Sequence, residues 1–262
     1  MLCNTNRCDK IVAVKRLQRN GDSCMELKKV TDIVEMFTGE NSKQKAKDFE
    51  ILLENGNKFQ KLMAYYKCAI MEVETKFKVL NESLSLRYDH NPIETIKTRL
   101  KDPKSIIDKV IRKGMDCTWT TIEKEMNDIA GIRVVCTFIE DVYMVAEYLM
   151  KQDDITLVEY KDYIKSPKEN GYRSLHVIVS IPIFLANEKR MMKVEVQFRT
   201  MAMDFWASLE HKLRYKKDLE CTEEIEKELK ECAETSAKLE EKMQYIKNKI
   251  EGLWRLNICL NY

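Results

Sequence analysis

The chain contains few residues that interrupt regular secondary structure: 7 glycines and 4 prolines among 262 residues. It also lacks low-complexity tracts and internal repeats. Because glycine and proline break helices, their scarcity favours a helix-rich folded protein. Hydrophobic residues make up 44% of the sequence, which is enough to build the core of one large domain or two small ones.

Long hydrophobic runs are missing as well. No apolar stretch approaches the ~20 residues that cross a bilayer. The N-terminal sequence MLCNTNRCDK does not contain the uninterrupted apolar segment of a signal peptide. We therefore expect a cytoplasmic protein with no membrane partner.

Neither sign of charge dominates, because 45 basic and 43 acidic residues leave a net charge of +2. The whole chain therefore does not require a nucleic acid partner, and any basic site must be local. The nine cysteines include no CxxC pair, and three histidines are too few to complete a metal shell with them. Reduced, structural thiols are expected.

The periodicity of apolar residues divides the chain into three segments. Residues 1–42 form an extension with weak periodicity, and residues 43–220 form the main domain, which begins with a long helix to about Leu86. Residues 221–262 form a C-terminal helix with apolar residues at 4,3 spacing, typical of a coiled coil or bundle. That spacing fits a subunit contact and a helix packed on its own domain equally well. The seam consists of Ile225, Leu229, Cys232, Ser236, Leu239, Met243, Ile246, Ile250 and Leu253.

Within the main domain, short helices are expected to begin at Pro92 and at Asp102-Pro103, the second with Asp102 as its N-cap. Alternating residues predict strands at about 132–138, 156–160, 174–181 and 192–198, and helices at 141–150 and 201–216. Strands flanked by helices, with a hairpin-like return, predict an α+β fold with a mixed β-sheet.

The loop SPKENGYRSLHVIV combines a turn with several recognition groups. Asn170-Gly171 is a strong turn signal, because both residues tolerate positive φ. An exposed polar turn entering a half-buried strand would look similar. The loop nevertheless offers one aromatic plate and three cationic or switchable donors, as a base and its phosphates require: Lys168, Tyr172, Arg173 and His176.

Three other stretches carry compatible chemistry. RLKDPKSIIDKVIRKG places Ser105 in a first helical turn, where free N–H groups favour an anion, although a solvated basic face is the simpler interpretation. NDIAGIRVV puts Asp128 directly before a strand, and MKVEVQFRT puts Glu195 on the polar face of another. Asp128 and Glu195 can hold Mg²⁺ while nearby cations neutralise phosphates, which is what metal-assisted phosphoryl transfer needs.

The motifs RLK…SIIDKVIRKG, DIAGIRVVCTF, DYIKSPKENGYRSLHVIV and VEVQFRTMAMDFWASLEHKLRYK occur in that order. From about Tyr65 to the C-terminal helix, the sequence resembles the RelA/SpoT-type synthetase domain, and most of all single-domain small alarmone synthetases of the RelQ type. The resemblance implies a nucleotidyltransferase-like fold. It also implies transfer of the β,γ-pyrophosphate of ATP to the ribose 3′-hydroxyl of GDP or GTP, which releases AMP and makes (p)ppGpp-type alarmones for the stringent response.

The resemblance also assigns roles to single residues. Arg99 and Arg133 would sandwich adenine. Asp128 and Glu195 would be the catalytic Mg²⁺ carboxylates, with Glu195 the candidate base for the 3′-hydroxyl. Tyr172 would stack on guanine. The remaining ATP contacts would be Lys101, Ser105, Lys109 and Arg112, and the remaining acceptor contacts Lys168, Asn170, His176 and Gln197.

Related enzymes of this type are homotetramers, so a homo-oligomer is expected. No His-Asp hydrolase domain and no ribosome-binding domain are expected. Thr95 follows the PIE triplet where the family has an aromatic residue that serves product activation. The alternatives are a nucleotide- or single-stranded-RNA-binding regulator with little catalysis and, last, a helical scaffold. The preferred acceptor among GMP, GDP and GTP stays open.

Overall fold

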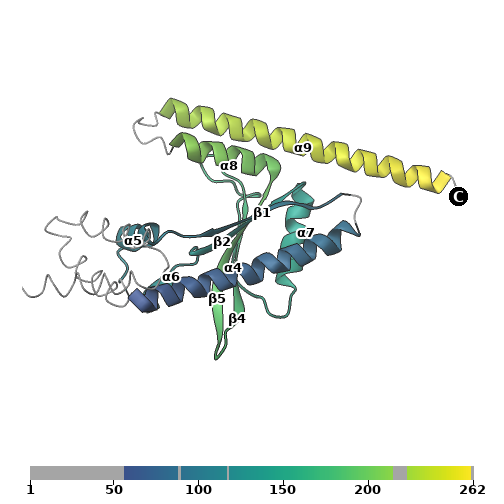
Figure 1. Cartoon of the computed structure of the whole chain (residues 1–262). Helices are drawn as coiled ribbons and strands as arrows, with labels where there is room; N and C mark the ends of the chain where they lie inside the picture. Colours follow the sequence, from purple (N-terminus) through teal and green to yellow (C-terminus); the bar gives the residue numbers. More distant parts are fainter. Residues whose placement is uncertain (1–55, 88–89, 117, 215–222, 261–262) are drawn as a thin grey trace, which may run out of the picture. The chain divides into compact units, whose positions relative to one another are not determined.

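The computed structural model describes residues 56–87, 90–116, 118–214 and 223–260 (Figure 1). The predicted extension at 1–42, the start of the first helix and the boundary near residue 220 lie outside these residues. The chain forms two compact units. Of the described residues, the smaller unit contains 56–59, 102–116 and 118–122, and the larger unit contains 60–87, 90–101, 123–214 and 223–260.

A five-stranded mixed sheet forms the centre of the larger unit. Its strand order is β1-β2-β5-β4-β3. Strands β2 and β5 are parallel, and every other neighbouring pair is antiparallel. This arrangement confirms the predicted α+β class. The strands are β1 (Ile93–Leu100), β2 (Ala130–Cys136), β3 (Thr156–Asp162), β4 (Leu175–Phe184) and β5 (Lys189–Thr200).

One face of the sheet is apolar and covered by helices. The alternating residues of β4 are fully buried at Leu175, Val177, Val179 and Ile181, as the period of two predicts. Helix α4 (Gly56–Ser85) packs here, because its Phe77 ring lies 5.7 Å from the ring of Phe198 on β5. Helix α7 (Ile139–Met150) contacts β2, β4 and β5. The other face is left for polar side chains.

The prediction of a helix beginning at Pro92 is wrong, because Ile93–Leu100 is strand β1. This strand pairs antiparallel with β2, from Ile93 opposite Cys136 to Leu100 opposite Ala130. The segment is rich in β-branched residues, which favour a pleated surface over a helix. Those residues are Ile93, Thr95, Ile96 and Thr98.

Strands β4 and β5 form a longer hairpin than the sequence predicted. Strand β4 continues to Phe184, and β5 already begins at Lys189. The Leu185 N–H donates to the Glu188 carbonyl over 2.9 Å and closes the connection between them. The alternation was correct, but it did not reveal where the hairpin turned.

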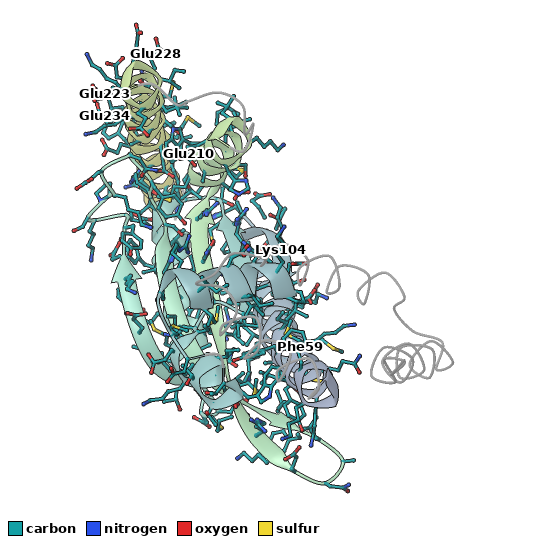
Figure 2. The ribbon with its side chains drawn as sticks, turned by 90° about the vertical axis from the view of Figure 1, so that its left-hand side faces the viewer. Phe59, Lys104, Glu210, Glu223, Glu228 and Glu234 are labelled. Atoms are coloured by element: carbon teal, nitrogen blue, oxygen red, sulfur yellow. The ribbon has the colours of Figure 1, made fainter. Side chains whose placement is uncertain are left out.

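In the smaller unit, helix α5 (Pro103–Arg112) begins as predicted. The Asp102 side chain accepts a hydrogen bond of 2.9 Å from the Lys104 N–H, and proline occupies the first helical turn. Helix α6 (Trp119–Glu125) was not predicted. The ring of its Trp119 lies 5.6 Å from that of Phe59, which Figure 2 labels.

Two helices follow the sheet and lie side by side: α8 (Met201–Arg214) and α9 (Glu223–Leu260) (Figure 1). The Trp206 indole on α8 donates 2.9 Å to the Leu229 carbonyl on α9. Trp206, Ala207 and Ala233 are buried together there. Glu223, Glu228 and Glu234 project from α9 in Figure 2. No helix among the described residues has the length and apolarity needed to cross a membrane.

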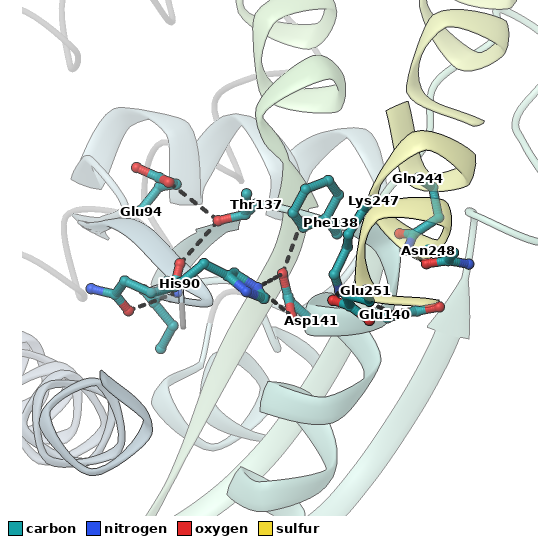
Figure 3. Close-up of polar contacts among 12 residues, drawn as sticks. His90, Glu94, Thr137, Phe138, Glu140, Asp141, Gln244, Lys247, Asn248 and Glu251 are labelled. Atoms are coloured by element: carbon teal, nitrogen blue, oxygen red, sulfur yellow. Dashed lines mark hydrogen bonds and ion pairs between the residues drawn. The ribbon is translucent and has the colours of Figure 1, made fainter. Parts of the chain in front are cut away.

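A second contact holds α9 near the start of α7 (Figure 3). The Lys247 ammonium lies 4.7 Å from the Phe138 ring centroid and 3.3 Å from the Glu140 carboxylate. On the other side of this contact, the His90 imidazole lies 3.2 Å from the Asp141 carboxylate. Helix α9 is thus anchored at two separate places on the larger unit.

Candidate functional site

The polar face of the sheet gathers many of the predicted site residues. Residues that lie directly opposite on paired strands point to the same face. Glu195 lies opposite Gly131, while Gln197 lies opposite both Arg133 and His176. Arg99 in turn lies opposite Gly131, which places no side chain between Arg99 and Glu195. The face therefore carries Lys97 and Arg99 on β1, Arg133 on β2, Glu195, Gln197 and Arg199 on β5, and His176 on β4.

Glu195 is a largely buried carboxylate with a donor at each oxygen. The Gln197 amide donates to Oε2 over 3.1 Å, and Nδ1 of His176 lies 3.4 Å from Oε1. Burial raises the pKa of the Glu195 carboxyl, but the hydrogen bonds from His176 and Gln197 lower it and leave the pKa below its usual value. Glu195 is therefore ionised at neutral pH.

Asp128 lies close enough to Glu195 for its charge to raise the Glu195 pKa. The Lys101 ammonium forms an ion pair with Asp128 at 2.7 Å. Among the described residues, no three His, Cys, Asp or Glu side chains gather into a metal site. Mg²⁺ is commonly held by one or two carboxylates together with waters and substrate phosphates, so this pair fits such an ion.

The Tyr172 ring lies beside two cations and two other rings. The Lys168 ammonium is 5.1 Å from its centroid and also lies over Tyr163 at 4.7 Å. The Arg199 guanidinium lies 5.2 Å from the same Tyr172 centroid. The Tyr163 and His176 rings meet it edge-on. An aromatic plate beside cations suits a nucleobase and its phosphates.

The turn before Tyr172 is built as the sequence predicted. Asn170 Oδ1 accepts from the Tyr172 N–H over 3.2 Å, and Gly171 has φ of +85°, a conformation that favours glycine. A Cβ on Gly171 would lie only 2.6 Å from the Ala233 Cβ on α9. Glycine is therefore needed here for two reasons, its dihedral angle and the close approach of α9.

Helix α9 also holds the loop of Lys168–Arg173 through a buried carboxylate. Glu240 accepts from the Arg173 guanidinium at 2.8 Å and from the Thr200 hydroxyl. Burial raises the pKa of Glu240, although these two partners oppose the shift. Nothing in the spacing of the sequence connected Glu240 with the loop.

Arg133 and Arg199 share one carboxylate, Asp204 on α8. Their guanidinium groups lie 3.0 and 3.1 Å from its Oδ1, and the Lys97 ammonium lies 3.1 Å from its Oδ2. Burial raises the Asp204 pKa, but the three cations more than offset it and lower the pKa. Sequence analysis missed Asp204 and gave Arg199 no role. For Arg199, the only indication of a role in the sequence was its position on the polar face of MKVEVQFRT.

The predicted ATP-binding residues are divided between the two units. Arg99, Lys101 and Arg133 belong to the larger unit. Ser105 lies in the first turn of α5, and Lys109 and Arg112 lie in its last turn, all in the smaller unit. Their convergence on one phosphate chain stays a prediction.

A family model and a characterised relative both match this chain. Residues 98–220 match the model of the family described as the region found in RelA / SpoT proteins. The chain is 45% identical to GTP pyrophosphokinase YwaC of Bacillus subtilis over 186 residues, covering 71% of this chain and 89% of that relative.

Solved structures agree. Small alarmone synthetase 2 from Bacillus subtilis superposes with a TM-score of 0.67 at 43% identity, covering 73% of this chain and 98% of that one. Small alarmone synthetase 1 from the same organism, bound to its product pppGpp, gives a TM-score of 0.68 at 35% identity, covering 74% and 98%.

Proposed function

The chain belongs to the RelA/SpoT family of alarmone synthetases, and from this premise we propose that it is a GTP pyrophosphokinase. It transfers the β,γ-pyrophosphate of ATP to the ribose 3′-hydroxyl of GDP or GTP and releases AMP. One observation carries the proposal: ionised Glu195 and the Tyr172 plate are joined through His176 on one face of the sheet. This contact supports a site in which the guanine of the acceptor lies near the carboxylate that would deprotonate its ribose.

The proposed site residues divide the work. Glu195 accepts the 3′-hydroxyl proton, for which its lowered pKa keeps it ionised. Arg99 and Arg133 bind adenine between their guanidinium planes, and Lys101, Ser105, Lys109 and Arg112 bind the ATP phosphates. Tyr172 stacks on guanine, with Lys168, Asn170, His176 and Gln197 around the acceptor.

Mg²⁺ suits this reaction, and Asp128 and Glu195 are the residues that would hold it. When bound, the ion would neutralise charge on the phosphates of ATP. Lys101 would then exchange its contact with Asp128 for the phosphates, since an ammonium group serves either partner.

The choice among acceptors depends on cations that bind the 5′-phosphates. We expect turnover with GDP and GTP, because Lys168 near the Tyr172 ring supplies a positive charge for a phosphate chain. Comparing kcat/KM for GMP, GDP and GTP under one condition tests the proposal. AMP release that is independent of all three acceptors would contradict it. The alternative, an RNA- or nucleotide-binding regulator, predicts binding without AMP release, and the intact Glu195 and Asp128 weigh against it.

Assembly into a homo-oligomer is part of the proposal. On α9 the predicted seam is largely exposed, with Leu239 62% and Ile246 39% accessible. The residues that pack on α8 lie on another side of the helix, at Ala233. An apolar stripe of this kind is suited to a partner helix, and in a tetramer it would join subunits.

Leu239→Asp combined with Ile246→Asp is therefore expected to yield smaller particles, because four or more carboxylates would be forced into an apolar contact. Light scattering of the purified protein measures the mass. Lys238→Asp combined with Tyr245→Asp is the matched control, since both residues are exposed and lie one position before the seam. An unchanged mass in the seam variant, with folding preserved, would contradict the subunit role of α9.

A further inference from the structure

Arg199 lies at the end of β5, where its side chain is 5% exposed. Its Nη1 donates to Asp204, and its Nη2 donates to the Tyr172 hydroxyl at 2.8 Å and to Gln197 Oε1 at 3.3 Å. An arginine can donate hydrogen bonds but cannot accept them. Arg199 is therefore the donor in all three of these hydrogen bonds.

Two chains of hydrogen bonds lead from Arg199 to Glu195, and we call them arms. The first arm runs through Tyr172. The Tyr172 oxygen accepts from Arg199, which leaves its own proton available for His176 Nε2, 2.8 Å away. When Tyr172 donates to Nε2, that nitrogen is the unprotonated one of a neutral imidazole and Nδ1 carries the hydrogen. That N–H faces Glu195 Oε1 at 3.4 Å.

The second arm runs along β5. Gln197 Oε1 accepts from Arg199, which leaves the amide nitrogen to donate to Glu195 Oε2 at 3.1 Å. The orientation of this amide follows from its neighbours, since one can only donate and the other, as a carboxylate, can only accept. Both arms begin at the same Arg199 nitrogen and end on the two oxygens of one carboxylate.

We propose that Arg199 is a positioning residue that orients the Glu195 carboxylate through two arms, and that the Tyr172 hydroxyl is a necessary link in one of them. The inference rests on the proposed function of Glu195 as the base. It gives Tyr172 two separable roles, because its ring binds guanine while its hydroxyl orients the base. Asp204 holds Arg199 in place from α8.

Tyr172→Phe separates the two roles, because it keeps the ring and removes the hydroxyl. We expect kcat to fall about 10- to 100-fold, as for other groups that orient a functional side chain through a hydrogen bond. The KM for GDP should change far less, since stacking is retained. Tyr160→Phe is the control, because it also removes a hydroxyl but from an exposed residue on β3. A wild-type kcat in Tyr172→Phe, or a loss expressed only in KM, would overturn the proposal.

Arg199→Lys keeps the charge but cannot reach Tyr172, Gln197 and Asp204 at once. It should lower kcat by at least as much as Tyr172→Phe. In the double variant, Tyr172→Phe should then cost much less than it does alone, because the arm it interrupts is already broken. Independent, additive losses would count against a shared pathway. If Arg199→Lys does not fold, the single Tyr172→Phe result still decides.

Nitrogen NMR of the histidine rings tests the geometry without any substrate. The chain has three histidines, so a His176→Gln variant suffices to assign the signal of His176. At mildly alkaline pH the protein alone should show His176 as the Nδ1–H tautomer. An Nε2–H tautomer or an imidazolium would overturn the proposal. An Nδ1–H tautomer in a protein that forms no alarmone would instead disprove only the proposed activity.

Discussion

Turnover is expected to fall about 10²- to 10⁴-fold when Glu195 is replaced by glutamine, the range associated with loss of a general base. Glutamine keeps the size of the side chain and can still accept from Gln197, but it loses the charge proposed to take up the 3′-hydroxyl proton. It would also remove one of the two carboxylates proposed for Mg²⁺. Steady-state rates of AMP formation measure the effect.

Binding of GDP should largely survive in Glu195→Gln, because the proposed guanine contact lies at Tyr172. Calorimetric titration with GDP provides this second measurement. Glu228→Gln is the matched control, since it makes the same chemical change at an exposed position on α9 (Figure 2). Turnover within a few-fold of wild type in Glu195→Gln would show that another group is the base.

Tyr172→Ala should weaken GDP binding roughly 5- to 150-fold, because stacking of a nucleobase on an aromatic ring is worth about 1 to 3 kcal/mol. Binding of a non-hydrolysable ATP analogue should change little, since the proposed ATP contacts are Arg99, Lys109 and Arg133. Titrating the same preparation with both ligands separates the two sites. Loss of affinity for the ATP analogue instead of GDP would overturn the assignment.

The two substitutions at Tyr172 should differ in kind. Alanine removes the ring and also leaves His176 Nε2 and Arg199 without the hydroxyl, so both affinity and kcat decline. Phenylalanine should lower kcat while GDP affinity is mostly retained. Equal kinetic effects of the two variants would contradict a separate role for the hydroxyl.

Sequence reasoning succeeded where burial of one face of a strand makes apolar and polar residues alternate. The apolar residues of β4 and β5 alternate because one face of each strand is buried against helices. The Asn170-Gly171 turn was predictable because few residues accept the positive φ of Gly171. These features depend on neighbours close in the sequence.

Sequence reasoning failed where residues far apart in the chain determine the local structure. Pro92 suggested a helix, whereas antiparallel pairing of Ile93–Leu100 with β2 makes a strand. Asp204 lies 71 residues from Arg133, and Glu240 lies 67 residues from Arg173, so no local spacing linked them. The period of α9 predicted a helix but did not identify Ala233 as the residue that approaches Gly171.

The central claim is tested most directly by following phosphorus labels from ATP in a reaction with GDP. Label at the β-phosphorus should appear, together with label from the γ-phosphorus, in a 3′-pyrophosphorylated guanosine nucleotide. Label at the α-phosphorus should remain in AMP. Transfer of the γ-phosphorus alone, with formation of ADP, would contradict the account, and so would the absence of any labelled guanosine product.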